Sequence, residues 1–272
     1  MSLAGRAVCC LEAVHDWTVT STISWIYMMV AALVERVRWG LPALVGDPHN
    51  GTVFILDGVG GTRMVPALVR KGLQEAAVPY ATYFFDWHHG PPGELLGDLM
   101  CMRRNRLEAA RLARLIRRFS REHPSAPVHV VAYSGGTGIA VWAAERLGGR
   151  ARIETLVLGC PALSPGYDLR PALRNVGRCY VLSSRRDWIM LGLGTSLLGT
   201  IDRRRGPAAG LVGLRMRNQP EKPDSPQDAK LKQIWWTREM RQYGHYGHHV
   251  GFATSRFVRH CIAPLLRTDA VK

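Results

Sequence analysis

The sequence predicts an α/β fold with a mostly parallel central sheet and helices on both of its faces. From residue 51 onward, short β-branched and apolar runs alternate with segments of helical periodicity, and this alternation is typical of a parallel sheet. Hydrophobic residues make up 47% of the 272-residue chain, which is enough for a large core and argues against intrinsic disorder. Several apolar runs end in glycine or polar residues, where open sheets of this class bind their ligands.

The first predicted strand covers residues 52–56 and leads into a glycine-rich loop at residues 57–61. Glycines directly after a strand allow unusual backbone angles and the close approach of a ligand. A helix is expected over residues 63–77, where apolar residues recur at helical spacing. The loop lacks the last glycine of a dinucleotide-binding fingerprint, and the chain contains no Walker phosphate loop.

The next strand is expected over residues 80–85, followed by His88 and His89 and then by one long helix over residues 94–122, ended by Pro124. Apolar residues line one face of this helix, and arginines form a stripe on another face that we interpret as solvated surface. The two histidines have no carboxylate partner at the spacing of metal ligands. We therefore interpret them as loop residues near the mouth of the site.

The central feature of the sequence is the turn at Ser134, within a predicted strand, turn and helix over residues 128–147. A serine at the apex of such a turn is the layout of a nucleophile elbow, although a Ser-Gly-Gly sequence also forms ordinary flexible turns. The elbow requires small residues two positions before and after the serine, and Ala132 and Gly136 meet that requirement. The new helix directs its free amides, beginning with that of Gly135, toward developing negative charge.

The rest of the chain continues the alternation of strands and helices. Strands are expected over residues 153–161, 178–184 and 231–236. A final helix is expected over residues 256–261, capped by Ser255 and ended before Pro264. Residues 191–228 are rich in glycine and proline and contain a basic cluster, so we expect them to fold over the site as a lid-like insertion.

Charge and cysteine usage restrict the classes of partner and compartment. The formal net charge is +15, which favours contact with anionic surfaces. The chain lacks a recognisable zinc finger or RNP motif and its charge is spread along its length, so we rank nucleic-acid binding last. Its six cysteines have no paired spacing, which is typical of reduced thiols in the cytoplasm and indicates neither a disulfide framework nor a zinc site.

The first 50 residues differ in character from the remainder and lack the pattern of a secretory signal. The uncharged run at residues 17–34 has the minimum length for a membrane span. Two interpretations stay open: a span, or a helix that packs on the domain or lies in the membrane interface. We divide the chain into an N-terminal apolar helix and connector, residues 1–50, and an α/β domain, residues 51–272, and expect a cytoplasmic protein that associates with membranes through residues 17–34.

Three motifs carry a resemblance to a known family. They are an Asp-Gly-x-x-Gly loop at residues 57–61, an Asp-Trp-x-x-Leu-Gly-Leu-Gly-Thr segment at residues 187–195 and a Gly-x-His-x-Gly loop at residues 247–251. With them, the chain resembles the α/β-hydrolase superfamily from about residue 51 to residue 266, and within it a group of bacterial serine hydrolases of the esterase and lipase type. The resemblance implies the α/β-hydrolase fold.

The resemblance also implies roles for individual residues. Ser134 would attack an acyl carbon as nucleophile, and His249 would take its proton and later return it to the leaving group. Asp187 would orient the imidazole and stabilise its charged form. The backbone amides of Val59 and Gly135 would form the oxyanion hole.

Two of these assignments have competitors in the sequence. Asp168 and Asp202 are alternative acids, although each is displaced from the expected strand end. His248 and His245 compete with His249, and spacing alone does not separate adjacent histidines.

The resulting functional hypothesis is a serine hydrolase that cleaves a carboxylic ester, of a small molecule or a lipid, through an acyl-enzyme intermediate. No cofactor and no metal ion are expected. The alternative is a non-catalytic binding protein of the same fold. An anionic membrane surface is the partner that the charge suggests, and the sequence does not set the oligomeric state.

Overall fold

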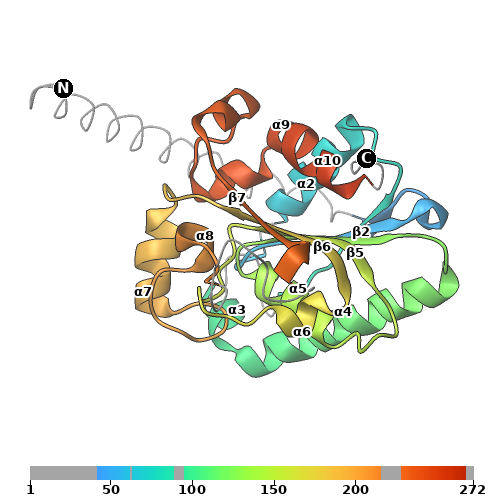
Figure 1. Cartoon of the computed structure of the whole chain (residues 1–272), viewed down its shortest axis with the longest axis horizontal. Coiled ribbons are helices and arrows are strands. Elements are labelled where there is room, and N and C mark those ends of the chain that lie inside the picture. The colour runs from blue at the N-terminus through green and yellow to red at the C-terminus, as the bar shows by residue number, and fades with distance from the viewer. Residues whose placement is uncertain (1–41, 62, 89–94, 216–227, 268–272) are drawn as a thin grey trace, which may run out of the picture. The chain divides into compact units, whose positions relative to one another are not determined.

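The computed structural model describes residues 42–61, 63–88, 95–215 and 228–267 (Figure 1). The apolar segment at residues 17–34 and its expected membrane association lie outside the described residues, as does part of the predicted lid-like insertion. No helix within the described ranges has both the length and the apolar character that crossing a membrane requires.

The described strands form one seven-stranded sheet in the order β1-β3-β2-β4-β5-β6-β7. All neighbouring strands are parallel except β1, which pairs antiparallel with β3. The strands are β1 (Leu44–Val45), β2 (Thr52–Leu56), β3 (Ala81–Phe84), β4 (Val128–Tyr133), β5 (Ile153–Gly159), β6 (Val176–Ser183) and β7 (Leu231–Trp235). The predicted fold class, a mostly parallel sheet with helices on both faces, is confirmed.

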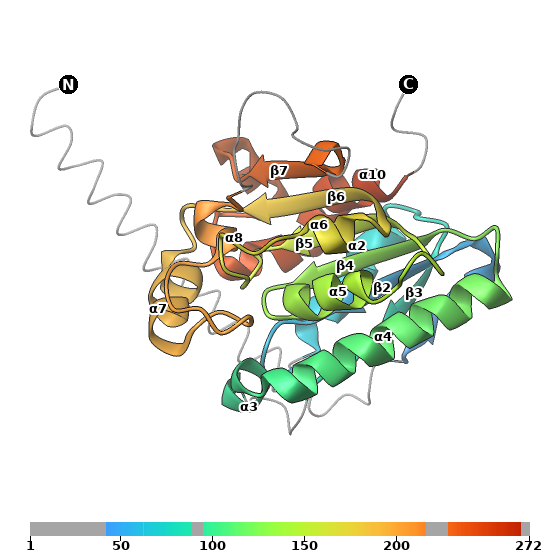
Figure 2. The same cartoon turned by 60° about the horizontal axis from the view of Figure 1, so that its bottom comes forward.

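Helices cover both faces of the sheet, as Figure 2 shows. One face packs on α4 (Met102–Glu122), α5 (Gly136–Glu145) and α6 (Arg170–Leu173), and the other on α2 (Met64–Glu75), α9 (Ser255–Phe257) and α10 (Ala263–Leu266). Successive residues of β2 alternate between the two cores: Phe54 and Leu56 join the first, and Val53 and Ile55 the second. Such a strand is apolar throughout because both of its faces are buried.

The remaining described elements are short. They are η1 (Pro48–Asn50), α3 (Leu95–Met100), the π-helical η2 (Ile189–Gly194), α7 (Thr195–Leu198), α8 (Ala209–Val212), η3 (Asp228–Lys230), η4 (Arg238–Tyr243), η5 (His249–Ala253) and the π-helical η6 (Val258–Ile262).

The prediction of a single long helix over residues 94–122 is wrong. The structure has two helices, α3 and α4, separated at Cys101, whose ψ of 67° lies outside the helical region. The side chain of Asn105 donates to the main-chain oxygen of Asp98 at 2.6 Å and stabilises the break. The break allows α3 to take its own direction, which brings Asp98 to the glycine-rich loop.

Three further expectations, about element ends and a connector, are wrong. The C-terminal helix does not stop before Pro264 but continues from α9 through the π-helical η6 into α10, where Pro264 occupies the first turn and needs no N–H partner. The residue before α9 is Thr254, and Ser255 is its first residue. The segment before β2, expected to be only a connector, contributes the two-residue strand β1, which is too short for a periodic signal.

Candidate active site

A sharp turn at the carboxyl ends of the strands lies at Ser134, between the end of β4 and the start of α5. Ser134 has a φ of 51°, a left-handed conformation that is uncommon for residues other than glycine. Its side chain is almost buried, and its backbone N–H donates to the carbonyl of Gly159 on β5 at 2.9 Å. The strained turn therefore belongs to a well-fixed part of the sheet.

Glycines beside Ser134 are required by close packing. A Cβ at Gly136 would lie 2.2 Å from the carbonyl oxygen of Asp57, at the end of the neighbouring strand β2. A Cβ at Gly58 would lie 3.1 Å from the Cβ of Ser134. The glycine-rich loop after β2 therefore contacts the serine turn directly.

Three side chains form a continuous hydrogen-bond chain at this edge. Nε2 of His249 lies 2.9 Å from Oγ of Ser134, and Nδ1 of the same ring lies 2.6 Å from Oδ2 of Asp187. Asp187 follows β6 and is 3% exposed. Burial raises the pKa of its carboxyl group, and the contact with His249 opposes that effect.

The backbone around His249 is held from several elements. The hydroxyl of Tyr133, on β4, donates to the carbonyl of His249 at 3.0 Å. The hydroxyl of Ser184, just after β6, donates to the carbonyl of Gly247 at 2.6 Å. The ring of Tyr133 also stacks on Phe252 with centroids 5.7 Å apart. These contacts connect the histidine loop to the two strands that carry Ser134 and Asp187.

The alternative acids and His245 have other partners. Asp168 makes a two-point contact with Arg170 at 2.8 Å on the surface, and Asp202 accepts from the backbone and hydroxyl of Ser164. Buried His245 accepts from the backbone N–H of Gly247.

Two backbone amides lie next to Ser134. A Cβ built on Gly135 would come within 3.5 Å of the backbone nitrogen of Val59. Within the described part of the chain, neither the N–H of Val59 nor that of Gly135 donates to a protein acceptor. Two free donors beside a hydroxyl can bind an oxygen that acquires negative charge.

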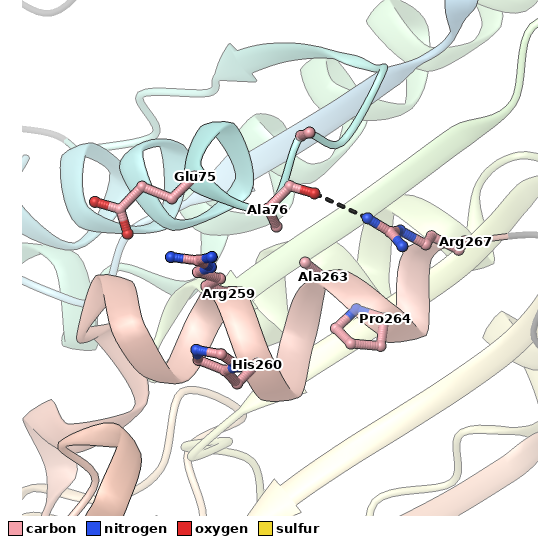
Figure 3. Close-up of a pocket in the computed structure, with 8 residues that line it drawn as sticks. Glu75, Ala76, Arg259, His260, Ala263, Pro264 and Arg267 are labelled. Carbon is pink, nitrogen blue, oxygen red and sulfur yellow. Dashed lines mark hydrogen bonds between the residues drawn. The ribbon is translucent and has the colours of Figure 1, made fainter.

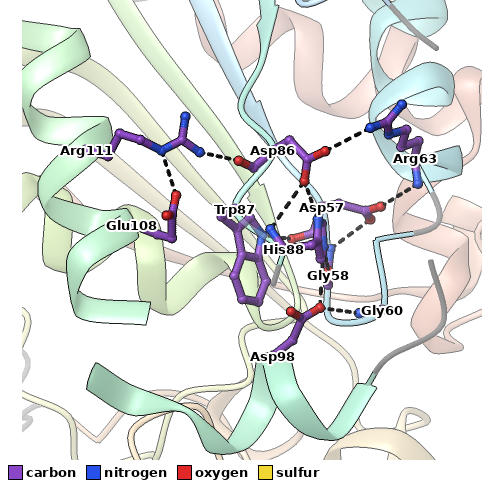
Figure 4. Close-up of polar contacts among 10 residues, drawn as sticks. All are labelled: Asp57, Gly58, Gly60, Arg63, Asp86, Trp87, His88, Asp98, Glu108 and Arg111. Atoms are coloured by element: carbon purple, nitrogen blue, oxygen red, sulfur yellow. Dashed lines mark hydrogen bonds and ion pairs between the residues drawn. The ribbon is translucent and has the colours of Figure 1, made fainter. Parts of the chain in front are cut away.

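A network of polar side chains that sequence reasoning missed holds the glycine-rich loop (Figure 4). The carboxylate of Asp57 accepts from the backbone N–H groups of Gly58 and Arg63 at 2.8 and 2.9 Å. Asp98 on α3 accepts from Gly60 N–H at 2.8 Å. Burial raises the pKa of Asp57 to about 6, although the charge of His88 opposes the shift.

His88 belongs to this network, so its interpretation as a simple loop residue was incomplete. The ring bridges Asp86 and the carbonyl of Gly58, at 2.8 and 2.7 Å. Its carboxylate partner, Asp86, lies only two residues earlier in the sequence. This proximity could have indicated the contact, although it is not a spacing typical of metal ligands. His89 lies outside the described residues.

The arrangement favours hydrogen bonding over metal binding. Cys160, Asp187 and His249 place one possible ligand atom each within 4.8 Å of one another. Both ring nitrogens of His249, however, already face Asp187 and Ser134.

A pocket of about 290 Å³ lies elsewhere, between the end of α2 and the C-terminal helices (Figure 3). Its lining includes Glu75, Arg259 and Arg267, and Arg267 donates to the carbonyl of Ala76 at 2.8 Å. Because α2 runs back from the carboxyl end of β2, this pocket lies near the amino ends of the strands, whereas Ser134 lies at their carboxyl ends.

Comparisons with known proteins found matches only among solved structures; no family model and no curated protein matches the chain. Lipase B of Aspergillus fumigatus is similar at 10% identity with a TM-score of 0.47, over 82% of this chain and 55% of the lipase. Est1E of Butyrivibrio proteoclasticus, solved with ferulic acid, is similar at 12% identity with a TM-score of 0.46, over 82% and 93%. A thioesterase domain from the curacin biosynthetic pathway is similar at 21% identity with a TM-score of 0.32, over 44% of this chain and only 40% of that domain.

Proposed function

We propose that this chain, whose described domain has the α/β-hydrolase fold, is a serine hydrolase that cleaves carboxylic esters. The observation that carries the proposal is the hydrogen-bond chain from Ser134 through His249 to Asp187, next to two backbone amides that have no acceptor among the described residues. Nucleophile, base and orienting acid in hydrogen-bond contact are the requirements for an activated serine.

In the proposed reaction, Ser134 Oγ attacks the ester carbonyl while Nε2 of His249 accepts its proton. The imidazolium then gives that proton to the leaving alcohol, and an acyl-enzyme remains. Water repeats the sequence and releases the acid. Asp187 fixes the ring so that Nδ1 carries the proton and Nε2 is free to accept one, since Nδ1 faces the carboxylate at 2.6 Å.

The amides of Val59 and Gly135 are proposed to bind the oxyanion. Both lie beside Ser134 without a protein acceptor among the described residues. The Gly135 amide also opens α5, where the helix dipole favours negative charge. One well-placed donor of this kind contributes about 3–4 kcal/mol to stabilising the transition state.

We further propose that the ester is carried by a lipid in an anionic surface. The segment that follows Asp187 exposes large apolar side chains, Trp188, Ile189, Met190, Leu193, Leu197 and Leu198. Residues 203–205 are exposed arginines, and Arg203 donates to the carbonyl of Leu198, so charge and apolar surface adjoin. Exposed apolar surface bordered by basic residues is suited to anionic lipid.

The primary test is labelling of the full chain with a fluorophosphonate, followed by peptide mapping. We expect labelling at Ser134 in the wild type and none in Ser134→Ala or His249→Ala. Ser164→Ala is the matched control, because the hydroxyl of Ser164 donates its hydrogen bond to Asp202. A folded wild type that does not label, or labels at another serine, contradicts the proposal and favours the non-catalytic binding protein.

The lipid part is tested separately by sedimentation with phosphatidylglycerol and phosphatidylcholine vesicles. Replacing the three arginines at 203–205 by glutamate should abolish binding to the anionic vesicles. The same charge change at Arg114, Arg118 and Arg121, all exposed on α4, should leave most of it. Equal losses in both variants contradict a localised surface.

A further inference from the structure

His88 is held between two groups that can only accept hydrogen bonds. Its Nδ1 lies 2.8 Å from Oδ1 of Asp86, and its Nε2 lies 2.7 Å from the carbonyl oxygen of Gly58. A neutral imidazole has one N–H and can satisfy only one of them, whereas an imidazolium satisfies both. The ionised state of Asp86 is favoured as well, because the bond from His88 lowers its pKa to about 2.

Two carboxylates besides that of Asp86 favour the imidazolium. Asp98, on α3, has a carboxylate oxygen 3.8 Å from Nε2, and Asp57 follows β2. Burial alone would lower the pKa of His88, but the bond to Asp86, the charge of Asp57, the Gly58 carbonyl and the charge of Asp98 outweigh it. The pKa of His88 is therefore raised.

Cationic groups in the network contact Asp86. Arg63, before α2, lies 3.1 Å from Oδ2 of Asp86, and Arg111, on α4, donates to its backbone carbonyl. The His88 ring itself is 7% exposed and stacks on Trp87, with centroids 4.7 Å apart. The ring is consequently fixed in position as well as in charge.

The carbonyl that faces His88 belongs to the same peptide group as the N–H of Val59. A peptide group is planar and trans, so its C=O and N–H point in opposite directions. A donor that fixes the C=O therefore fixes the direction of the N–H. A cationic donor also polarises the group, which strengthens the N–H as a donor in its turn.

We propose that His88, as an imidazolium, is a positioning residue that orients and polarises the Gly58–Val59 peptide behind the oxyanion site. The inference rests on the proposed function, because it assigns the Val59 N–H to the oxyanion. On the other side of Val59, the carboxylate of Asp98 accepts a hydrogen bond from the N–H of Gly60. The loop is thus fixed on both sides of Val59 by side chains from β3's carboxyl end and from α3.

The chain provides a matched control at Asp47 and His49. The pair has the same two-residue spacing and the same 2.8 Å contact from Nδ1 to Oδ1 as Asp86 and His88, but it lies on the surface. His88→Ala should slow fluorophosphonate labelling roughly 100-fold, the lower end of the loss for an oxyanion donor. In His88→Gln the side-chain amide keeps a neutral donor for the Gly58 carbonyl, so labelling should be about tenfold faster than in His88→Ala. His49→Gln should label at the wild-type rate.

The pH dependence separates a charge effect from a merely structural one. Labelling by the wild type should fall as pH rises through the raised pKa of His88, because the imidazolium then loses its proton. Asp86→Asn removes the main stabilising partner and should move this fall to lower pH. His88→Gln should lack the fall altogether, and the KM for an ester substrate should change little in any of these variants.

The protonation state can be measured without turnover. Histidine-labelled ¹⁵N NMR of the full chain, with His88→Gln used for assignment, should show protons on both ring nitrogens of His88 at pH 7. A neutral ring in a wild type that labels normally overturns this inference alone. Labelling by His88→Gln at the wild-type rate over the whole pH range also overturns it, whereas an unreactive wild type overturns the proposed function and with it the role of His88.

Discussion

Replacing Gly136 by alanine should damage the serine turn through a clash with backbone. The added Cβ would lie 2.2 Å from the carbonyl oxygen of Asp57, where ordinary contacts begin at 3.4 Å, and 3.1 Å from Cβ of Leu56. Neither the carbonyl nor the strand can rotate away as a flexible side chain would. The start of α5 and the loop after β2 must therefore separate by roughly 1 Å, a distance set by the missing space.

The separation affects both stability and reactivity. Overpacking of this kind costs about 1–3 kcal/mol of unfolding free energy, which the better helix propensity of alanine offsets by up to ~1 kcal/mol. Reactivity should fall further, roughly 100-fold, because a shift of about 1 Å misaligns reacting groups. Ser134 and Gly135 lie on one side of this junction and Val59 on the other.

The assay is fluorophosphonate labelling beside urea unfolding, with two glycine controls. Gly138→Ala, also on α5, meets the side chain of Ile201 at 2.5 Å and should lose stability while keeping most of its labelling rate. Gly166→Ala lies in an exposed loop with nothing within 4 Å of the new Cβ. It should leave the labelling rate unchanged and change the unfolding free energy by no more than about 0.5 kcal/mol. A Gly136→Ala protein with wild-type labelling and stability would refute the packing argument.

Three other predictions concern groups around the site and in the core. Asp187→Asn should slow labelling roughly 10⁴-fold with little change in fold, because the amide no longer holds the ring with its proton on Nδ1. Tyr133→Phe removes the bond to the carbonyl of His249, so stability should fall by about 1 kcal/mol and labelling by a few-fold. His129 is buried without a partner for either ring nitrogen among the described residues, and burial lowers its pKa from 6.5 to about 4. Between these pH values the unfolded state binds the proton and the folded state does not, so the unfolding free energy falls as pH falls. His129→Leu should therefore remove roughly 2–3 kcal/mol of that loss at pH 4.

These three predictions are checked by labelling rates and by urea unfolding at several pH values. Near-normal labelling by Asp187→Asn would mean that the carboxylate does not direct the proton. Equal stability of Tyr133→Phe and wild type would mean that the hydroxyl bond contributes nothing net. For His129, an unchanged pH slope in the leucine variant would assign acid sensitivity elsewhere, for example to His245, whose pKa is lowered to about 3 by burial.

Strands in the middle of the sheet could be predicted closely from sequence. The strand predicted over residues 52–56 coincides with β2, and the strand predicted to begin at residue 128 and end at the Ser134 turn coincides with β4. Strands buried on both faces are continuous apolar runs, which makes them easy to find. The break at Cys101 could not be predicted, since no proline in residues 95–122 marks it. It depends on the contact of Asp98 with Gly60, 38 residues earlier in the chain.

The candidate site was predictable only where it follows strands. Ser134 could be nominated because it directly follows an apolar run, and Asp187 because it follows another after three further polar residues. Both lie at the carboxyl ends of strands, where such sheets carry ligands. Spacing does not separate adjacent histidines, so His248 and His249 could be distinguished only by the distances from His249 to Asp187 and Ser134. The importance of His88 depends on a carbonyl 30 residues away, for which no local pattern exists.

Because 115 residues separate Ser134 from His249, the proposed serine chemistry requires segments that are distant in the sequence to be folded at the same time. A state that had lost only β7 and the segments after it would retain the strained turn but not the base. Covalent labelling would cease in such a state while circular dichroism still recorded most of the helices. Comparing the two signals along a denaturant titration would therefore reveal whether the edge of the sheet near β7 opens before the centre, which makes the proposed chemistry a local probe of folding cooperativity.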